Sequence, residues 1–246
     1  MLGLPEDIRA CLFDLDGVLT QTASVHRAAW QETFDACLPR WAPEGVTPEP
    51  FDPESDYNRY VDGRARADGV RTFLASRGIT LPDGEPGDPP ERDTVYGVGS
   101  RKNEILLRRI RADGVLVFEE SVAYVRATER AGLRRAVVSS SQNTREILAS
   151  TGLTDLFEVI VDGVLARELG LPGKPQPDTF LEAARQLAVP AERSAVFEDA
   201  VAGVAAGRAG GFGFVVGVDR VGQAEDLRRN GADVVVTDPG QLLEMR

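Results

Sequence analysis

Two pairs of acidic residues each follow a short apolar run, and they are the first candidates for chemistry. Asp14 and Asp16 come directly after residues 10–13, at a spacing that aims both carboxylates to one side of an extended chain. Glu198 and Asp199 form a second pair after a later apolar run. Paired carboxylates repel each other, so a cation must join them or one must hold a proton. Carboxylate oxygens suit Mg²⁺, which also takes phosphate oxygens as ligands.

A serine and a lysine extend this set. Ser139 ends the apolar run 135–138 and offers a hydroxyl and nearby backbone N–H groups to a phosphoryl oxygen. Lys174 lies in a stiff, proline-bracketed loop (173–177) and supplies a positive charge. Phosphoryl transfer depends mainly on positioning and charge neutralisation. The acids, the hydroxyl and the lysine together therefore predict a phosphoryl-transfer site.

The elements that must position these side chains alternate between strand and helix. After the strand at 10–14, the pattern predicts strands at 135–138, 159–161, 195–197, 212–216 and 233–236. Helices are predicted between them at 120–131, 143–150, 178–187, 200–209 and 223–230. This rhythm predicts an α/β fold with a doubly wound, mostly parallel, Rossmann-like core sheet. Ligands of such sheets collect at the carboxyl ends of the strands, where the polar residues stand.

A mostly helical segment interrupts the alternation after the first strand. We expect a helix at 24–38 with Ser24 as its N-cap, a connection at 39–56, and a helix at 57–77 broken near 62–63. A loop at 81–99 and a charged helix at 101–110 follow. The segment predicts a helical cap domain at 21–112, inserted over the ligand edge of a core formed by 1–20 and 113–246.

Composition excludes several classes of protein. The 246 residues carry a formal charge of −11, which disfavours binding to nucleic acid or to an anionic membrane. One histidine and two cysteines are too few for multi-ligand zinc or iron–sulfur sites. No apolar run is long enough to span a bilayer, and the N-terminus lacks the features of a secretion signal. We expect a cytoplasmic protein, either a monomer or a weak homodimer.

The motifs, in this order, resemble the haloacid-dehalogenase-like superfamily. Asp14-x-Asp16-Gly17, then Ser139, Lys174-Pro175 and Glu198-Asp199 carry the resemblance along the whole core. It implies that Asp14 attacks phosphorus and becomes an aspartyl-phosphate, while Asp16 is the general acid and base. It also implies Mg²⁺ held by Asp14, Asp199 and the backbone carbonyl of Asp16, with Glu198 as a further candidate ligand. Ser139 and Lys174 complete the implied catalytic set.

The predicted cap is similar to that of the β-phosphoglucomutase branch of this superfamily. Residues 22–30 resemble its first cap helix, 62–68 its substrate loop, 101–103 its cap lysine motif, and 139–143 its core phosphate loop. Gln142 stands where the branch usually has a lysine, and Arg64, Arg66 and Arg145 are candidates to replace that charge. The substrate-binding residues implied by the resemblance are His26, Trp30, Gly63, Arg64, Arg66, Lys102, Ser141, Gln142 and Asn143.

Three functions are compatible with these residues. The first is a Mg²⁺-dependent phosphomutase that converts β-glucose 1-phosphate to glucose 6-phosphate. The second is a phosphatase acting on a small phosphorylated sugar, in which water attacks the aspartyl-phosphate. The third is a non-catalytic sensor of sugar phosphates, against which the intact Asp14 and Asp16 pair argues.

Overall fold

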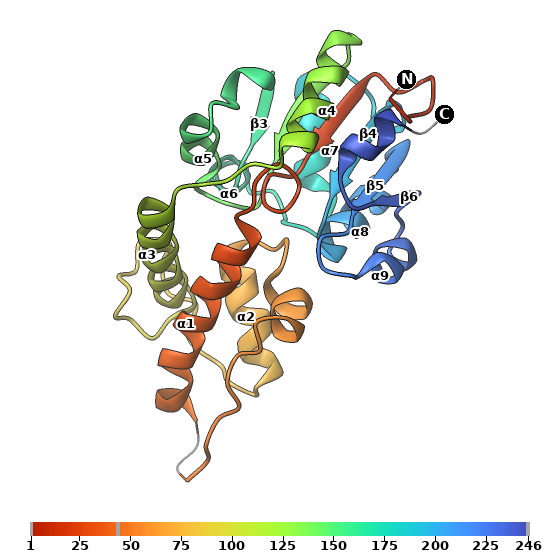
Figure 1. Ribbon diagram of the computed structural model, residues 1–246. Coiled ribbons are helices and arrows are strands. Elements are labelled where there is room, and N and C mark those ends of the chain that lie inside the picture. The colour runs from red at the N-terminus through yellow and green to blue at the C-terminus, as the bar shows by residue number, and fades with distance from the viewer. Residues whose placement is uncertain (1, 43–44, 245–246) are drawn as a thin grey trace. The chain divides into compact units, whose positions relative to one another are not determined.

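The computed structural model describes residues 2–42 and 45–244, and the chain divides into two compact units (Figure 1). One unit, here called the core unit, comprises Met1–Gln21 and Val115–Arg246. The other, the helical unit, comprises Thr22–Gly114. The catalytic motifs predicted from the sequence all belong to the core unit.

The core unit is built on a six-stranded parallel sheet in the order β3-β2-β1-β4-β5-β6. The bounds are β1 Ala10–Phe13, β2 Arg134–Val138, β3 Val159–Val161, β4 Ser194–Glu198, β5 Phe214–Val218 and β6 Val234–Val236. The two central strands pair in register, with Phe13 opposite Phe197. This register brings Asp14 and Glu198, the residues that follow them, to the same edge of the sheet. The predicted doubly wound α/β fold is confirmed.

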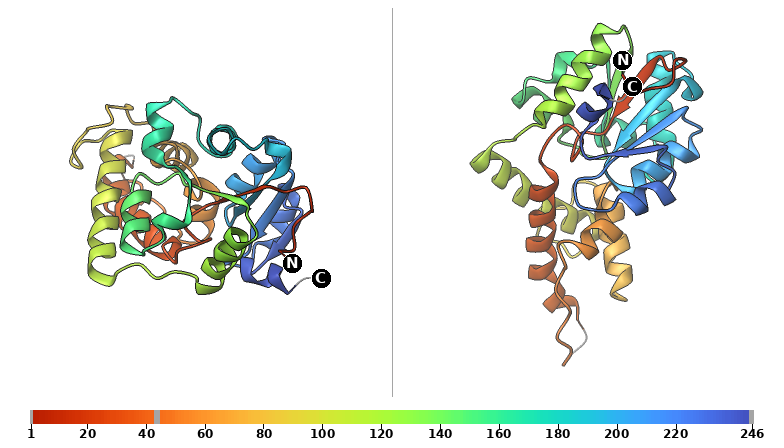
Figure 2. Two further views of the ribbon diagram at one scale, coloured as in Figure 1. Left: turned by 90° about the horizontal axis from the view of Figure 1, so that it is seen from above. Right: turned by 45° about the vertical axis from the view of Figure 1, so that its right-hand side comes forward.

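Helices cover both faces of this sheet (Figure 1). They are α4 Glu119–Arg130, α5 Thr144–Ser150, α6 Gly163–Glu168, α7 Asp178–Leu187, α8 Val201–Ala209 and α9 Ala224–Arg229. Alternate side chains of β1 point to opposite faces. Leu12 packs in one core cluster with Phe180 of α7, whereas Phe13 stacks on Phe197 at 4.5 Å and meets Tyr124 of α4. The start and end of the described chain adjoin on this unit, because Gly3 lies against Leu242 (Figure 2).

The helical unit contains α1 Ala23–Trp41, a short π-helix η1 Tyr57–Val61, α2 Arg66–Ser76 and α3 Val95–Asp113. Its core is aromatic. Phe34 of α1 is fully buried and stacks on Trp30 at 5.1 Å and on Phe51 at 5.3 Å between ring centres. Phe73 of α2 lies 4.1 Å from Phe34 by the same measure. These rings pack α1 against Phe51 of the connecting chain and against α2.

Several local expectations were wrong. Ser24 lies inside α1, whose N-cap is Thr22, and α1 continues through Pro39 to Trp41 into the predicted connection. Residues 43–44 of that connection lie outside the described residues. The predicted loop at 81–99 ends early, because α3 already begins at Val95. Its N-cap Thr94 accepts a hydrogen bond from the N–H of Gly97, which stabilises the first turn of the helix. The glycines of this segment had predicted a loop. Helix α6 was not predicted.

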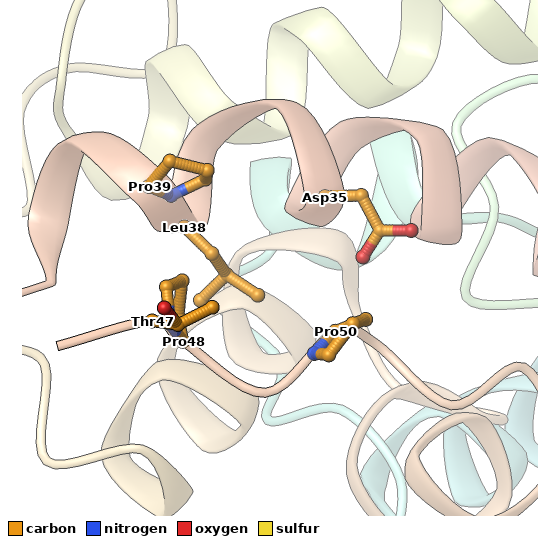
Figure 3. A pocket seen from close by; sticks show the side chains of 6 residues that line it. All are labelled: Asp35, Leu38, Pro39, Thr47, Pro48 and Pro50. Carbon is orange, nitrogen blue, oxygen red and sulfur yellow. The ribbon is translucent and has the colours of Figure 1, made fainter.

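One cavity of about 270 Å³ lies in the helical unit (Figure 3). It is bordered by the last turns of α1 and by the extended chain that returns from it, with Asp35, Leu38, Pro39, Thr47, Pro48 and Pro50 as lining residues. None of these residues belongs to a predicted site. Among the described residues, no helix is both long and apolar enough to cross a membrane.

Candidate active site

Lys174 is the centre of a buried polar cluster at the carboxyl edge of the sheet. Its ammonium group donates to Asp14 Oδ1 at 2.6 Å, to Glu198 Oε1 at 2.5 Å and to the carbonyl oxygen of Val138 at 3.1 Å. These three bonds use every donor of the ammonium. The charge also lies 4.9 Å from the ring centre of Phe180. The ends of β1, β2 and β4 are thereby joined at one point.

Glu198 ends β4 and uses both of its carboxylate oxygens. Oε1 accepts from Lys174, and Oε2 accepts from the backbone N–H of Ala200 at 2.9 Å. The carboxylate lies against α8, where a Cβ on Gly203 would come within 1.8 Å of Oε1. Glycine normally destabilises a helix interior. Here it gives Glu198 the space to reach the lysine.

The loop after β1 closes on itself and carries Asp16, which is partly buried. The N–H of Gly17 donates to the carbonyl oxygen of Thr20 at 2.8 Å. The N–H and hydroxyl of Thr20 donate to the carbonyl oxygen of Leu15 at 3.0 and 3.1 Å. Gly17 has a φ of +85°, and a Cβ there would lie 1.8 Å from Asp199 Oδ2. Glycine therefore allows the second acidic motif to approach the first.

Electrostatics at the cluster follow from burial and from the surplus of carboxylates. Burial raises the pKa of Asp14 well above its usual range; the Lys174 charge opposes this, while Glu198 and Asp16 raise the pKa further. Burial alone would lower the pKa of Lys174, but attraction to Asp14 and Glu198 outweighs it and raises the pKa. The lysine therefore stays charged. Two carboxylates share one ammonium and the charge of Asp16 lies near Asp14, so an added cation would relieve the imbalance.

Ser139 opens a turn that is built on serine hydroxyls. Its Oγ accepts from the N–H of Ser141 at 3.1 Å, and Ser141 Oγ accepts from the N–H of Asn143 at 3.2 Å. The N–H of Gly163 donates to the carbonyl oxygen of Ser141 at 3.0 Å, which fixes the turn against the start of α6. Gln142 lies between the last two turn residues. The turn follows Val138, whose carbonyl binds Lys174, so Ser139 adjoins the cluster in the chain.

In the helical unit, three predicted substrate-binding residues lie together. Lys102 Nζ lies 3.1 Å from His26 Nδ1 and 5.2 Å from the ring centre of Trp30. Lys102 is 3% exposed. Helices α1 and α3 are linked by this contact.

The predicted substrate loop occupies the passage from η1 into α2. Gly63 has a φ of +68°, and the N–H of Arg64 donates to the carbonyl oxygen of Val61 at 3.3 Å. Arg66 opens α2 and donates to the carbonyl oxygen of Gly99 at 3.4 Å. A Cβ on Gly99 would lie 3.2 Å from Arg66 Cδ, so this glycine leaves room for the arginine beside α3.

The residues fit a magnesium ion that substrate and water would help to coordinate. Across residues 2–42 and 45–244, no three His, Cys, Asp or Glu side chains are grouped closely enough to hold a metal by themselves. Mg²⁺ is commonly held by one or two carboxylates plus phosphate oxygens and water. Asp14 and Asp199 are buried carboxylates of this kind. Glu198 is already bonded through both oxygens, so its role as a ligand remains a prediction.

Three residues that the sequence did not single out contact the motifs. Gly203 makes room for Glu198, and its place in a helix interior was the available signal. Arg220 Nε donates to the carbonyl oxygen of Gly17 at 2.8 Å, and Gln223 Nε2 donates to that of Asp199 at 2.8 Å. Both side chains bind backbone atoms far away in sequence. No local pattern marks such contacts.

Buried carboxylates neutralised by one lysine at the carboxyl edge of a parallel sheet are suited to binding and transferring a phosphoryl group. The fold and this cluster define the chain as an enzyme of phosphoryl transfer.

Comparison with known proteins gives the family. Residues 8–211 match the model of the haloacid dehalogenase-like hydrolases, and the chain belongs to this family. It is 57% identical to a β-phosphoglucomutase of Mycobacterium bovis, over 99% of this chain and 94% of that protein. It is 30% identical to a β-phosphoglucomutase of Bacillus subtilis, over 96% and 92%. The structure of a β-phosphoglucomutase from Clostridium difficile shares the fold, with a TM-score of 0.72, 24% identity, and coverage of 96% and 93%.

Proposed function

We propose that this enzyme is a Mg²⁺-dependent phosphomutase that converts β-glucose 1-phosphate to glucose 6-phosphate. The observation that carries the proposal is the 57% identity to a mycobacterial β-phosphoglucomutase over nearly the full length of both chains. The buried contact between Lys174 and Asp14 supports it, because a nucleophilic carboxylate needs a neighbouring cation to approach an anionic phosphate.

Asp14 is the proposed nucleophile and Asp16 the proposed acid and base. The phosphorylated Asp14 carboxylate gives its phosphoryl group to the 6-hydroxyl of β-glucose 1-phosphate, and Asp16 accepts the hydroxyl proton. The bound glucose 1,6-bisphosphate then reverses its orientation, so that the phosphate on C1 faces Asp14. Asp14 Oδ attacks the phosphorus on C1, the bond from C1 oxygen to phosphorus breaks, and Asp16 returns its proton to that oxygen. Glucose 6-phosphate leaves, and Asp14 is phosphorylated again.

The remaining core residues neutralise and orient the phosphoryl group in this proposal. Lys174 holds the Asp14 carboxylate in place and offsets negative charge. Ser139 donates its hydroxyl to a phosphoryl oxygen. Asp14 and Asp199 would hold the magnesium ion together with the backbone carbonyl of Asp16. When bound, the ion neutralises charge on the phosphoryl oxygens.

In this proposal, residues of the helical unit bind the second phosphate group of the substrate. We assign the distal phosphate to Arg66, with Gly63 and Arg64 forming its loop. The cluster of His26, Trp30 and Lys102 is assigned to the sugar phosphate as well. Ser141, Gln142 and Asn143 of the core turn are also proposed to bind the substrate. A cytoplasmic location and a monomer or weak homodimer remain predictions.

The second candidate is a phosphatase for a small phosphorylated sugar. Gln142 favours it, because a glutamine replaces a lysine that the resembled branch uses in the core phosphate loop. Loss of that cation weakens the hold on a second phosphate. Both reactions use the same nucleophile, so they differ only in what accepts the phosphoryl group from Asp14.

A single assay separates the two reactions. The enzyme is given β-glucose 1-phosphate with Mg²⁺, with and without catalytic glucose 1,6-bisphosphate, and both glucose 6-phosphate and inorganic phosphate are measured. The mutase forms glucose 6-phosphate after priming and releases little phosphate. Phosphate release that matches substrate consumption would establish the phosphatase instead. In either case, Asp14→Asn is expected to lose activity by several orders of magnitude, whereas unchanged turnover in that variant would exclude both.

A further inference from the structure

A compact turn follows β5 at residues 219–223, on the same edge of the sheet as the acidic motifs. Asp219 Oδ1 accepts from the N–H groups of Val221, Gly222 and Gln223 at 3.2, 2.7 and 2.8 Å. A carboxylate that binds several successive N–H groups holds a turn in one conformation. Two long side chains, Arg220 and Gln223, leave this turn toward the motifs.

Arg220 binds the loop that carries Asp16. Its Nε donates to the carbonyl oxygen of Gly17 at 2.8 Å, and its NH2 group lies 3.3 Å from the carbonyl oxygen of Val18. These are the two residues immediately after Asp16. The planar guanidinium also stacks on the ring of Phe118, 3.5 Å from its centre. Stacking and a forked donor set fix the orientation of an arginine, so the two loop carbonyls are held in one geometry.

The other side of the guanidinium is anchored in the C-terminal segment and α4. Its NH1 group donates to the carbonyl oxygen of Thr237 at 2.6 Å and to Asp238 Oδ2 at 3.0 Å. Its NH2 group donates to Ser121 Oγ at 3.0 Å, and Ser121 in turn donates to Asp238 at 3.0 Å. The arginine therefore ties the Asp16 loop to a network that contains no catalytic group.

Gln223 binds the other acidic motif. Its Nε2 donates to the backbone carbonyl oxygen of Asp199 at 2.8 Å. The Asp199 carboxylate lies against Gly17, the residue whose carbonyl Arg220 holds. One short turn thus holds the backbone on both sides of the point where the two acidic motifs meet.

We propose that Arg220 and Gln223 are positioning residues that fix the Asp16 loop and the Asp199 backbone relative to each other for phosphoryl transfer. The inference rests on the proposed function, because it assigns work to Asp16 and Asp199. Neither residue contacts the reacting atoms. Displacement of a catalytic group by about 1 Å can cost on the order of 100-fold in rate. The turn at 219–223 holds Asp199 through its own backbone carbonyl and Asp16 through the carbonyls of the two residues that follow it.

The test compares variants that differ in which half of the network they remove. Arg220→Lys keeps the charge near Asp238, but an ammonium cannot hold both loop carbonyls and the C-terminal anchor. Arg220→Met removes all of the bonds, and Gln223→Ala removes only the bond to Asp199. Ser121→Ala loosens the anchor and leaves both loop carbonyls bonded. Arg208→Lys is the matched control, since Arg208 binds Gly231 and Asp233 and contacts neither motif.

Steady-state kcat and KM are measured at 25 °C with saturating Mg²⁺, and the thermal midpoint of each variant is recorded. We expect kcat to fall by about 10- to 100-fold in Arg220→Lys and more in Arg220→Met, and by about 10-fold in Gln223→Ala, each with KM changed less than about twofold. Ser121→Ala and Arg208→Lys are expected to keep the kcat of the wild type even where their midpoints fall.

Two results would overturn the proposal. One is a kcat within about twofold of the wild type in both Arg220→Lys and Gln223→Ala. The other is a kcat that simply follows the thermal midpoint across all five variants, which would make Arg220 a stabilising residue only. If Arg220→Met does not fold, the two milder variants still decide. Failure of the proposed function would be recognised from the wild type itself, which would then have no activity on sugar phosphates.

Discussion

The ammonium of Lys174 donates to Asp14 at 2.6 Å across 160 residues of sequence. The same ammonium binds Glu198, so one cation balances two buried carboxylates. Among the 28 Lys and Arg residues of the chain only Lys102 and Lys174 are lysines, and both are buried. A compact ammonium with three donors fits a buried site of convergent acceptors, whereas a guanidinium presents a wider, planar fork.

Removal of the Lys174 charge is expected to destabilise the core unit. Lys174→Met leaves Asp14 and Glu198 buried without a cation, and breaking a buried pair in this way costs about 3–5 kcal/mol. Urea unfolding of the variant measures the loss. Arg228→Met is the matched control, because it removes an exposed ion pair to Glu225, and such pairs contribute about 0–1 kcal/mol. Equal stability of the two variants would contradict a central role for Lys174.

Replacement of Gly203 by alanine is expected to destabilise the protein, although alanine usually stabilises a helix more than glycine does. Gly203→Ala places a Cβ 1.8 Å from Glu198 Oε1, so Glu198 must move away from Lys174. We expect a loss of about 1–3 kcal/mol from overpacking and a lower kcat. Gly207→Ala in the same helix is the control, since its Cβ meets side-chain carbons at 3.2 Å or more and leaves Glu198 untouched. A fully active Gly203→Ala would show that Glu198 tolerates displacement.

Arg66 is expected to act on binding more than on the chemical step. If its guanidinium holds the distal phosphate, Arg66→Ala loses a charged hydrogen bond of about 1.5–3 kcal/mol, which raises KM by about 10- to 100-fold. Its kcat should change far less. Arg71→Ala, in the same helix, removes exposed ion pairs to Asp68 and Asp83 and serves as the control. An unchanged KM in Arg66→Ala would rule out the assigned contact.

Chelation is expected to abolish turnover reversibly. Asp14 and Glu198 share one ammonium and Asp16 adds negative charge near Asp14, so a second cation is needed before an anionic phosphate can approach. Activity should disappear in excess EDTA and return with Mg²⁺, but only weakly with Ca²⁺, which prefers more ligands at longer distances. Circular dichroism before and after chelation checks that the fold is kept. Full activity after exhaustive chelation would contradict the assigned magnesium ion.

The core sheet could be predicted because each strand contains an apolar run that ends in a polar residue or is followed directly by one. Asp14, Ser139 and Glu198 fall at strand ends, and parallel strands bring those ends to one edge. The contact of Lys174 with Asp14 has no such local signal, because the sequence predicted only a positive charge on a stiff, proline-bracketed loop. Arg220 and Gln223 were missed because they bind backbone carbonyls that only the folded chain brings near.

The segment at 81–99 shows why local composition misleads. Its glycines and prolines predicted a loop, yet Gly97 and Gly99 lie in α3. A Cβ on Gly97 would lie 2.3 Å from the carbonyl oxygen of Arg92, so the glycine is required by close packing of the loop on the helix. Glycine reports a need for space as well as a turn, and the sequence alone does not distinguish the two.

Asp88 accepts several hydrogen bonds within the same loop, and its ionisation makes the stability of the loop depend on pH. Asp88 Oδ1 accepts from Arg92 at 2.7 Å, and Oδ2 accepts from the Thr94 hydroxyl at 2.7 Å and from the N–H of Glu85 at 3.1 Å. Hydrogen bonds from Thr94 and Arg92 lower the pKa of Asp88 below its usual value of 3.8. The ionised form is therefore bonded more strongly in the folded chain than in the unfolded chain.

Asp88→Asn is expected to lower the thermal midpoint at neutral pH and to lose this effect in acid. A depressed carboxyl pKa contributes stability above the unfolded value, and the contribution disappears as pH falls through the lower folded value. The difference in thermal midpoint between the wild type and Asp88→Asn should thus become smaller below about pH 4. Asp93→Asn, which removes an exposed ion pair to Arg40, should show little gap at any pH. A gap for Asp88→Asn that stays constant from pH 7 to pH 3 would assign its effect to shape and not to charge.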